Sequence, residues 1–415
     1  MIIDILCILN EKIKALDIDE GDIIKAIDQK AYIHIFDNVK DFRQKGKVTY
    51  PLHDLLMMIL ICVFELGRTS YLAIADYIYI SRNEFCKLGL LKDTANIPSH
   101  DTIRRVLSNL DSESLLEEAL NGFYNFLSSL ERNVKKDYEY THTCIDGKEN
   151  RGSGRHKGSG TPKGNIGHLN VLSKGTMTCI YSETIEKKDS EITAAQKILE
   201  KMDLKRKVIT ADALHCQRKT TEIIDDRKGR YVICVKDNQA LLKEEIASRF
   251  SRYKYSTYTK ENRIIDIYHL PKGYSTDGFK GLKCFARMAN TSKNRKGTRY
   301  FISNSNDDEL IAEAVLDRWS IENDLHKVKD DYLHEDMFHG TDKVANKNVA
   351  ILNNIAVQLV YLYMAITGEC LRISKAQFRK YPLDTINYIL AFMGSVEIID
   401  KIVKELKKDK RKPRK

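Results

Sequence analysis

The sequence predicts an α/β protein in which a helical N-terminal region precedes a sheet-forming region. Apolar segments of helical length fill the chain up to about residue 132. From residue 133 onward, short segments rich in β-forming residues alternate with helical ones. Strands that alternate with helices are typical of an α/β sheet, so the two regions differ in architecture.

The first region, residues 1–132, contains predicted helices at residues 55–66, 71–80, 102–110 and 112–130. Its longest apolar run, residues 55–64, is far shorter than the roughly 20 residues that cross a bilayer. We therefore expect a buried core helix there, and no membrane partner.

The second region spans residues 133–370. Its predicted strands are residues 140–145, 168–172, 177–185, 207–211 and 231–235, with helices at 190–201 and 217–228. Residues 249–305, which hold many Tyr, Lys and Arg residues, predict a β-rich insertion. A long helix capped by Asn306 or Asp307 then runs to residue 331, and an apolar helix covers residues 346–367. Residues 371–415 are expected to form C-terminal helices and a basic tail.

The charge balance favours a polyanionic partner. The 415 residues include 68 Lys and Arg against 58 Asp and Glu, a formal net charge of +10, although this balance also suits a protein that is merely soluble. The nine cysteines include no CxxC pair, which indicates reduced thiols and a cytoplasmic location.

Two aspartates directly follow predicted strands. Asp146 comes after strand 140–145, and Asp212 comes after strand 207–211. Because sites in open α/β sheets gather at the carboxyl ends of strands, a cation between these carboxylates would relieve their repulsion. Oxygen ligands of this kind suit Mg²⁺ or Mn²⁺. The alternative is that each aspartate caps a turn or the following helix.

A third carboxylate, Glu322, lies in the long helix predicted to end at residue 331. Arg318, Glu322 and His326 are spaced four residues apart and so share one helix face, with Lys329 close to it. Trp319, the only tryptophan, and apolar neighbours predict that the helix packs on the sheet with this polar stripe facing a site. The alternative is a solvated face with a structural ion pair between Arg318 and Glu322.

Four motifs together resemble one family. The segments 144–148 (CIDGK), 210–217 (TADALHCQ), 235–239 (VKDNQ) and 318–326 (RWSIENDLH) resemble the ISAs-type, or H-repeat-associated, transposases of bacterial insertion sequences in order and spacing. Residues 97–105 (IPSHDTIRR) are similar to the N-terminal associated domain of that family. The resemblance covers roughly residues 30–365. Lys327 departs from the family pattern, which often has Trp there, and Met337, Phe338 and His339 stand where Arg residues are usual.

The resemblance implies an RNase H-like catalytic domain with a DDE triad, which falls by motif on Asp146, Asp212 and Glu322. It implies that two divalent ions, Mg²⁺ or Mn²⁺, are bound there, with Asp146 between both. The implied partner is double-stranded DNA, namely the element ends and a target, which a homodimer cuts and joins at the nucleoid in the cytoplasm. The helical region 1–132 is implied to bind DNA.

Other residues near the triad are candidates for DNA contact or support. Those in or just before the acid-free stretch could neutralise phosphates: Lys148, Arg151 and Arg155. Those after strand 231–235 either line a DNA channel or cap the next helix: Lys236, Asn238 and Gln239. Those around Glu322 could orient it or contact the scissile phosphate: Arg318, Trp319, Asn323, His326 and Lys329.

Three other functions stay open. A zinc hydrolase would use nearby His and Cys residues, but their spacing fits no common zinc pattern. A catalytically inactive DNA-binding protein derived from a transposase would suit the basic charge equally well, but has no need of three carboxylates. A metal-dependent nuclease without strand transfer would use the same site, so only its products distinguish it.

Overall fold

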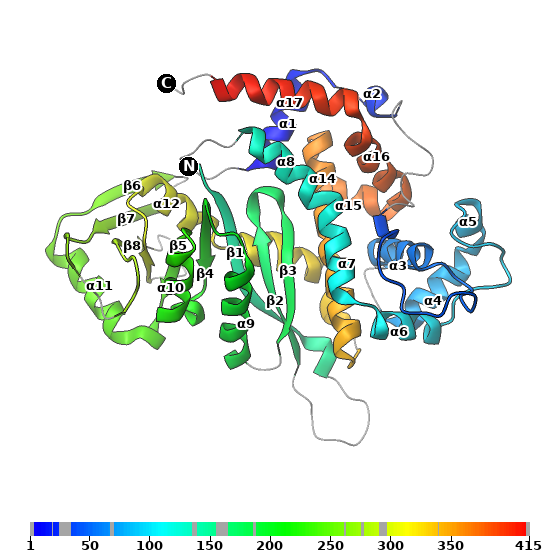
Figure 1. The fold of residues 1–415 in the computed structure, drawn as a ribbon, viewed down its shortest axis with the longest axis horizontal. Helices are drawn as coiled ribbons and strands as arrows, with labels where there is room; N and C mark the ends of the chain where they lie inside the picture. Colours follow the sequence, from blue (N-terminus) through cyan, green and yellow to red (C-terminus); the bar gives the residue numbers. More distant parts are fainter. Residues whose placement is uncertain are drawn as a thin grey trace.

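The computed structural model of the chain describes residues 4–18, 20–24, 35–66, 70–134, 139–154, 165–185, 188–260, 263–274, 278–289, 297–338 and 340–411. Figure 1 shows a central sheet with helices on both faces and a group of helices beside it. The mixed α/β architecture expected from the sequence is confirmed.

The sheet has nine strands in the order β3-β2-β1-β4-β5-β9-β8-β7-β6. The first five along the chain are β1 (Thr141–Asn150), β2 (Ile166–Ser173), β3 (Thr178–Ile185), β4 (Lys207–Ala211) and β5 (Arg230–Val235). β1 pairs antiparallel with β2 and parallel with β4, and β4 pairs parallel with β5. This order and these directions are those of the RNase H-like fold that the family resemblance implied.

The predicted insertion is β-rich and extends the same sheet. Its strands are β6 (Ser256–Lys260), β7 (Arg263–His269), β8 (Cys284–Ala289) and β9 (Thr298–Ser303). β9 pairs antiparallel with β5, so the edge of β5 is covered by the protein's own backbone. An unpaired strand at that position would be open to association with other chains.

Helices cover both faces of the sheet because successive residues of a strand point to opposite sides. Ile209 and Ile233 share a core with α9 (Lys188–Lys201), α10 (Arg218–Asp226) and α11 (Ala240–Arg252). Val208 and Val232 share a second core with α12 (Asp308–Asp317). Asp307, one of the two predicted caps, begins α12 by accepting a hydrogen bond from the N–H of Leu310.

Many of the remaining helices pack against one long helix, α14 (Lys343–Thr367). Its neighbours include α1 (Ile5–Ala15), α3 (Leu52–Leu66), α6 (His100–Asn109), α7 (Ser112–Ala119), α15 (Leu371–Lys380) and α16 (Pro382–Gly394). The others outside the sheet region are α2 (Glu20–Ile24), α4 (Tyr71–Ile80), α5 (Arg82–Lys87), α8 (Asn125–Val134), α13 (Lys327–Asp331) and α17 (Val396–Arg411).

Among the described helices, α14 alone is long and apolar enough to cross a membrane, but 83% of its most apolar window is buried inside the protein. It is therefore a core helix. The core around it combines N-terminal and C-terminal helices, so the boundary expected at residue 132 separates segments that share one core. The division into three domains stays a prediction.

Candidate active site

Two of the predicted carboxylates occupy matching positions on neighbouring parallel strands. The pairing of β1 with β4 ends at Ile145 and Ala211, and Asp146 and Asp212 are the next residues of the two strands. The prediction that the first strand ends at Asp146 is wrong, because β1 stays paired with β2 up to Asn150. Asp146 thus lies inside β1, where its parallel neighbour departs.

The sequence predicted one continuous helix from residue 306 or 307 to residue 331, but the helix that carries Glu322 is interrupted. A π-helical turn, Ile321–His326 (η7), separates α12 from α13. Hydrogen bonds in such a turn join residues five apart, and the N–H of Lys327 donates to the carbonyl of Glu322. Glu322 is exposed and His326 is buried, so the two do not share the face that a spacing of four predicted.

Arg318 links two of the carboxylates. Its Nη1 lies 3.8 Å from Asp212 Oδ1 and 3.7 Å from Glu322 Oε1. The Trp319 ring is 4.3 Å from the Arg318 guanidinium and 4.4 Å from that of Arg299 in β9. The ion pair between Arg318 and Glu322, considered as a structural alternative, is therefore present, but Asp212 shares the same guanidinium.

A hydrogen-bonded chain leads to Asp146. Asn170 lies opposite Asp146 in the pairing of β1 with β2, accepts at Oδ1 from Ser182 at 3.1 Å, and donates from Nδ2 to His326 Nε2 at 3.1 Å. Because Nε2 accepts, the ring proton lies on Nδ1, 3.7 Å from Asp146 Oδ2. Burial, together with nearby lysine charges, lowers the pKa of His326 well below its usual value, so the ring is neutral.

Asp146 has the most perturbed environment of the three. Burial, and then the charges of Glu322, Glu191 and Asp212, raise its pKa to about 7, against the opposing charge of Arg318. Like charges raise the pKa of a carboxyl only when they are close to it. The three predicted carboxylates therefore share one electrostatic environment, together with a fourth, Glu191.

Asp212 is held ionised. Burial opposes its ionisation, but hydrogen bonds from Lys236 and the backbone N–H of Ala213, with the charges of Lys236 and Arg318, lower its pKa. Lys236 Nζ lies 2.9 Å and 3.0 Å from the two carboxylate oxygens. Asn238 and Gln239 donate to the carbonyls of Ala213 at 2.7 Å and Cys216 at 2.9 Å. They thus hold the loop after Asp212, which neither of their two expected roles described.

Glu191, near the start of α9, was not predicted from the sequence. Its Oε1 lies 3.2 Å from His215 Nε2, and both side chains are largely buried. A Cβ on Gly147 would lie 2.7 Å from the Glu191 carboxylate, so the close approach of Glu191 requires a glycine after Asp146. Glu191 belongs to none of the motifs. The one related feature in the sequence is its partner His215, which lies inside the motif around Asp212.

Lys148 and Lys329 belong to a buried ion cluster. Lys148 Nζ lies 2.8 Å from Asp330 Oδ1, 2.8 Å from Glu335 Oε2 and 3.2 Å from Asp336 Oδ1. Lys329 Nζ lies 3.2 Å from Glu335 Oε1 and is fully buried. Both ammonium groups are paired with carboxylates in a cluster that fastens α13 to β1. Contact of either lysine with a phosphate, which the sequence led us to expect, stays a prediction.

The other candidates differ in accessibility. The Arg151 side chain is 80% exposed, with Nε 3.9 Å from Asp336 Oδ2, and Asn323 is exposed. Arg155 lies outside the described residues. DNA contact by these residues stays a prediction.

The carboxylates have the chemistry of a metal site but not its arrangement. Within the described ranges, no three His, Cys, Asp or Glu side chains are arranged to hold an ion, and Arg318 and Lys236 lie against the carboxylates instead. Carboxylate oxygens nevertheless suit a hard divalent cation. Such a cation would also remove the repulsion that raises the pKa of Asp146. The chemistry of the donors therefore fits, although their arrangement is not closed.

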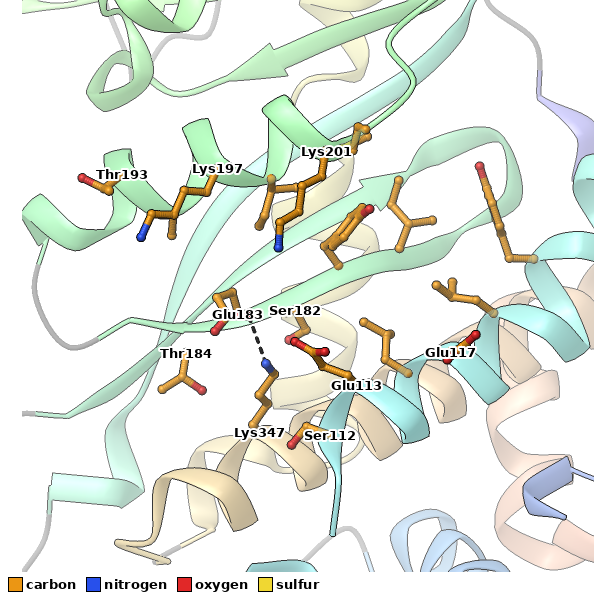
Figure 2. A pocket seen from close by; sticks show the side chains of 18 of the residues that line it. Ser112, Glu113, Glu117, Ser182, Glu183, Thr184, Thr193, Lys197, Lys201 and Lys347 are labelled. Atoms are coloured by element: carbon orange, nitrogen blue, oxygen red, sulfur yellow. Dashed lines mark hydrogen bonds and ion pairs between the residues drawn. The ribbon is translucent and has the colours of Figure 1, made fainter. Parts of the chain in front are cut away.

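A large cavity among the described residues lies away from the carboxylates. It has a volume of about 1060 Å³, lies between α7, β3 and α9, and contains none of these three carboxylates. Figure 2 shows Lys197 and Lys201 of α9 on one side and Glu113 and Glu117 of α7 on the other. Its walls thus carry both signs of charge.

The model of the family described as Transposase DDE domain matches residues 137–359, and that described as DDE_Tnp_1-associated matches residues 33–123. The chain belongs to the family of DDE-domain transposases. This confirms the resemblance identified from the motifs, and all three predicted carboxylates fall inside the matched DDE domain.

Named relatives of this DDE transposase support the assignment. It is 31% identical over 321 residues to YncI of Escherichia coli O157:H7, which carries the name of a transposase, over 72% of this chain and 79% of that protein. It is 28% identical over 322 residues to the H repeat-associated YhhI of Escherichia coli strain K12, over 72% and 82% respectively.

A piggyBac transposase in a synaptic complex with hairpin DNA aligns at a TM-score of 0.38 and 11% identity, over 100% of this chain and 86% of that one.

Proposed function

We propose that this DDE transposase cuts the ends of an insertion sequence and joins them to target DNA, with Asp146, Asp212 and Glu322 as its catalytic carboxylates. This proposal rests on the position of Arg318, whose Nη1 lies 3.8 Å from Asp212 Oδ1 and 3.7 Å from Glu322 Oε1. The charges of the same two carboxylates raise the pKa of Asp146. Residues from three distant elements thus act on one another.

Asp146, Asp212 and Glu322 would hold two divalent ions, Mg²⁺ or Mn²⁺. Such a pair activates the attacking oxygen and stabilises the leaving oxygen of a phosphodiester. Arg318 and Lys236 keep Asp212 ionised before any ion binds, because their charges and the Lys236 hydrogen bond lower its pKa. The neutral His326 turns its Nδ1 proton toward Asp146 and helps to orient that carboxylate.

The proposed partner is double-stranded DNA, both the element ends and the target. Because two ends have to be processed together, we propose that a homodimer forms on the DNA. The reaction takes place in the cytoplasm, at the nucleoid.

The test is a cleavage and strand-transfer assay with DNA that carries the element ends, a target plasmid, and Mg²⁺ or Mn²⁺. Asp146→Asn, Asp212→Asn and Glu322→Gln are each expected to abolish cleavage while DNA binding persists, because each removes one ligand charge but little volume. Asp237→Asn is the matched control, since this exposed carboxylate also follows a strand and, among the described residues, forms an ion pair with Lys243 alone. It is expected to leave cleavage unchanged.

The products decide among the alternatives. Full activity in EDTA would contradict the metal proposal. Cleavage without joining would assign the chain to the nucleases, and DNA binding without cleavage under any metal would assign it to the inactive derivatives.

A further inference from the structure

Helix α15 carries a stripe of cations on its solvent side. Arg372, Lys375 and Arg379 are spaced three and four residues apart, so they lie along one face of the helix. With Lys380 they line a groove of about 950 Å³, whose lining includes one acidic residue, Glu65. The groove is therefore strongly positive, unlike the mixed-charge cavity in Figure 2.

These cations have no ion-pair partner among the described carboxylates. Lys375 Nζ and the Arg379 guanidinium instead lie 5.4 Å and 5.8 Å from the centre of the Tyr332 ring. Burial and the charge of Lys327 lower the pKa of Lys375, although the charge of Asp331 opposes this. A bound anion would relieve the repulsion between the two lysines.

Lys327 relates the stripe to the proposed catalytic site, because its charge acts on Lys375 and it follows Glu322 closely in the chain. The π-helical turn η7 sets Lys327 one hydrogen-bonded turn after Glu322, and both side chains are exposed. The ten residues from Glu322 to Tyr332 run through the π-helical turn and α13, so they cover at most about 15 Å. A duplex whose scissile phosphate lies at Glu322 has phosphates within reach of α15.

The dimensions of the stripe suit a phosphate backbone. From Arg372 to Arg379 the helix rises about 10 Å, and each DNA strand carries a phosphate about every 3.4 Å along the duplex axis. Three cations at this spacing can contact about three consecutive phosphates. We propose that Lys327 and the α15 stripe (Arg372, Lys375 and Arg379) bind the phosphate backbone of duplex DNA on one side of the scissile phosphate.

This inference rests on the proposed function, since only a DNA-processing site gives the stripe a duplex to hold. The test measures how the affinity for a fluorescent duplex of arbitrary sequence depends on NaCl concentration. It uses the full chain in EDTA, so no DNA is cut. The variant combines Arg372→Gln, Lys375→Gln and Arg379→Gln.

Each lost phosphate contact is expected to reduce the slope of log affinity against log salt by about 0.9, hence by about 2.7 for three. The control combines Lys197→Gln, Lys201→Gln and Lys205→Gln, which removes the same charge from exposed positions in or just after α9. This control is expected to keep most of the slope. A variant with Arg372→Lys and Arg379→Lys keeps the charges and is expected to bind as the parent does.

An unchanged slope in the triple α15 variant would overturn the proposal, and so would an equal loss in the α9 control. An unchanged slope with lost self-association would assign the stripe to a protein contact and also overturn it. Because the measurement needs no cleavage, a chain that cuts no DNA can still bind through α15. Failure of the proposed function and failure of this surface are thus distinguishable.

Discussion

Gly147 follows Asp146 and faces the side chain of Glu191. A Cβ there would lie 2.7 Å from Cδ and Oε2 of Glu191. We expect Gly147→Ala to lower the free energy of unfolding by about 1–3 kcal/mol, because the added methyl group overpacks the site. Urea denaturation measures the change. Combining it with Glu191→Ala is expected to cost less than the sum of the single substitutions, since the clash disappears.

Gly122→Ala is the matched control. Apart from the backbone of its own helix, no heavy atom of the described residues lies within 4 Å of a Cβ there, and alanine favours a helical backbone more than glycine does. It is therefore not expected to destabilise the fold. Strict additivity between Gly147→Ala and Glu191→Ala would show that the two residues do not interact.

Asp146 is expected to destabilise the metal-free protein above neutral pH. Its pKa of about 7, against 3.8 for the free group, means that ionisation costs free energy in the folded state. That cost is absent below about pH 4, grows as the pH rises and is complete above about pH 7. In EDTA, Asp146→Asn should therefore be more stable than the parent at pH 8, on the order of a few kcal/mol. The difference should largely vanish at pH 4 in urea melts, and equal stabilities at pH 8 would contradict the perturbed pKa.

For single residues, the sequence was a better guide to which carboxylates lie near one another than to the contacts of the lysines beside them. Asp146, Asp212 and Glu322 were found from motifs, and they share one environment. Lys148 was expected to contact phosphates, and Lys329 either to orient Glu322 or to contact the scissile phosphate. Their burial was not foreseen, because a lysine beside an acidic motif gives no sign of its own burial. Their ion pairs depend on Glu335 and its neighbours, which are brought near only by the fold.

The element α13 is fastened by a buried charge cluster. Glu335 is buried between Lys329 and Lys148. Glu335→Gln leaves both ammonium groups with less compensation, so we expect it to lower the free energy of unfolding by about 3–5 kcal/mol at pH 7. Thermal or urea melts measure this.

The control is Glu183→Gln on β3. Glu183 pairs with Lys347 but is half exposed, so its loss is expected to cost no more than about 1 kcal/mol. Burial opposes ionisation of Glu335, yet the lysine charges lower its pKa well below 4.5. Its stabilising effect is present above pH 4.5 and is lost as the pH falls toward its folded pKa, so the gap between parent and Glu335→Gln should narrow in acid. A gap that does not depend on pH would contradict this assignment.

Most elements could be predicted from periodicity, but their irregularities could not. The predicted strand 140–145 overlaps the first half of β1, whose extension to Asn150 depends on β2 rather than on local sequence. The predicted helices 112–130 and 306–331 each contain a π-helical turn, at Leu120–Tyr124 and Ile321–His326. One inserted residue per turn leaves no distinct pattern of apolar residues, so spacing alone cannot reveal it.

At the scale of the whole molecule, an aromatic contact joins a helix from the N-terminal part of the chain to one from the C-terminal part. Phe64 of α3 stacks on Phe378 of α15 with ring centroids 4.5 Å apart, and both are buried. We expect Phe378→Ala to cost about 3–5 kcal/mol and to destabilise the N-terminal helices with it. Ile373→Ala, at an exposed position of the same helix, is expected to have little effect. Loss of α15 alone, with the N-terminal helices still protected in hydrogen exchange, would contradict the shared core.

The sequence was a poorer guide to how the helices and strands pack together than to where each one lies along the chain. The alternation of strands and helices predicted a sheet. It did not predict that β9 would pair with β5, which extends the sheet to nine strands. The sequence also gave no sign that α14 would gather helices from both ends, because contacts between distant segments have no local signature. The RNase H-like order was expected only through the family resemblance.

The shared core has a consequence for how the protein is made. Translation completes α3 and α8 early, yet their apolar surfaces are covered only after α14 to α17 have been synthesised. A nascent chain stopped before that point exposes these surfaces and is open to aggregation or proteolysis. Truncated products of this gene should therefore be cleared, and should not persist as folded fragments beside the full-length transposase.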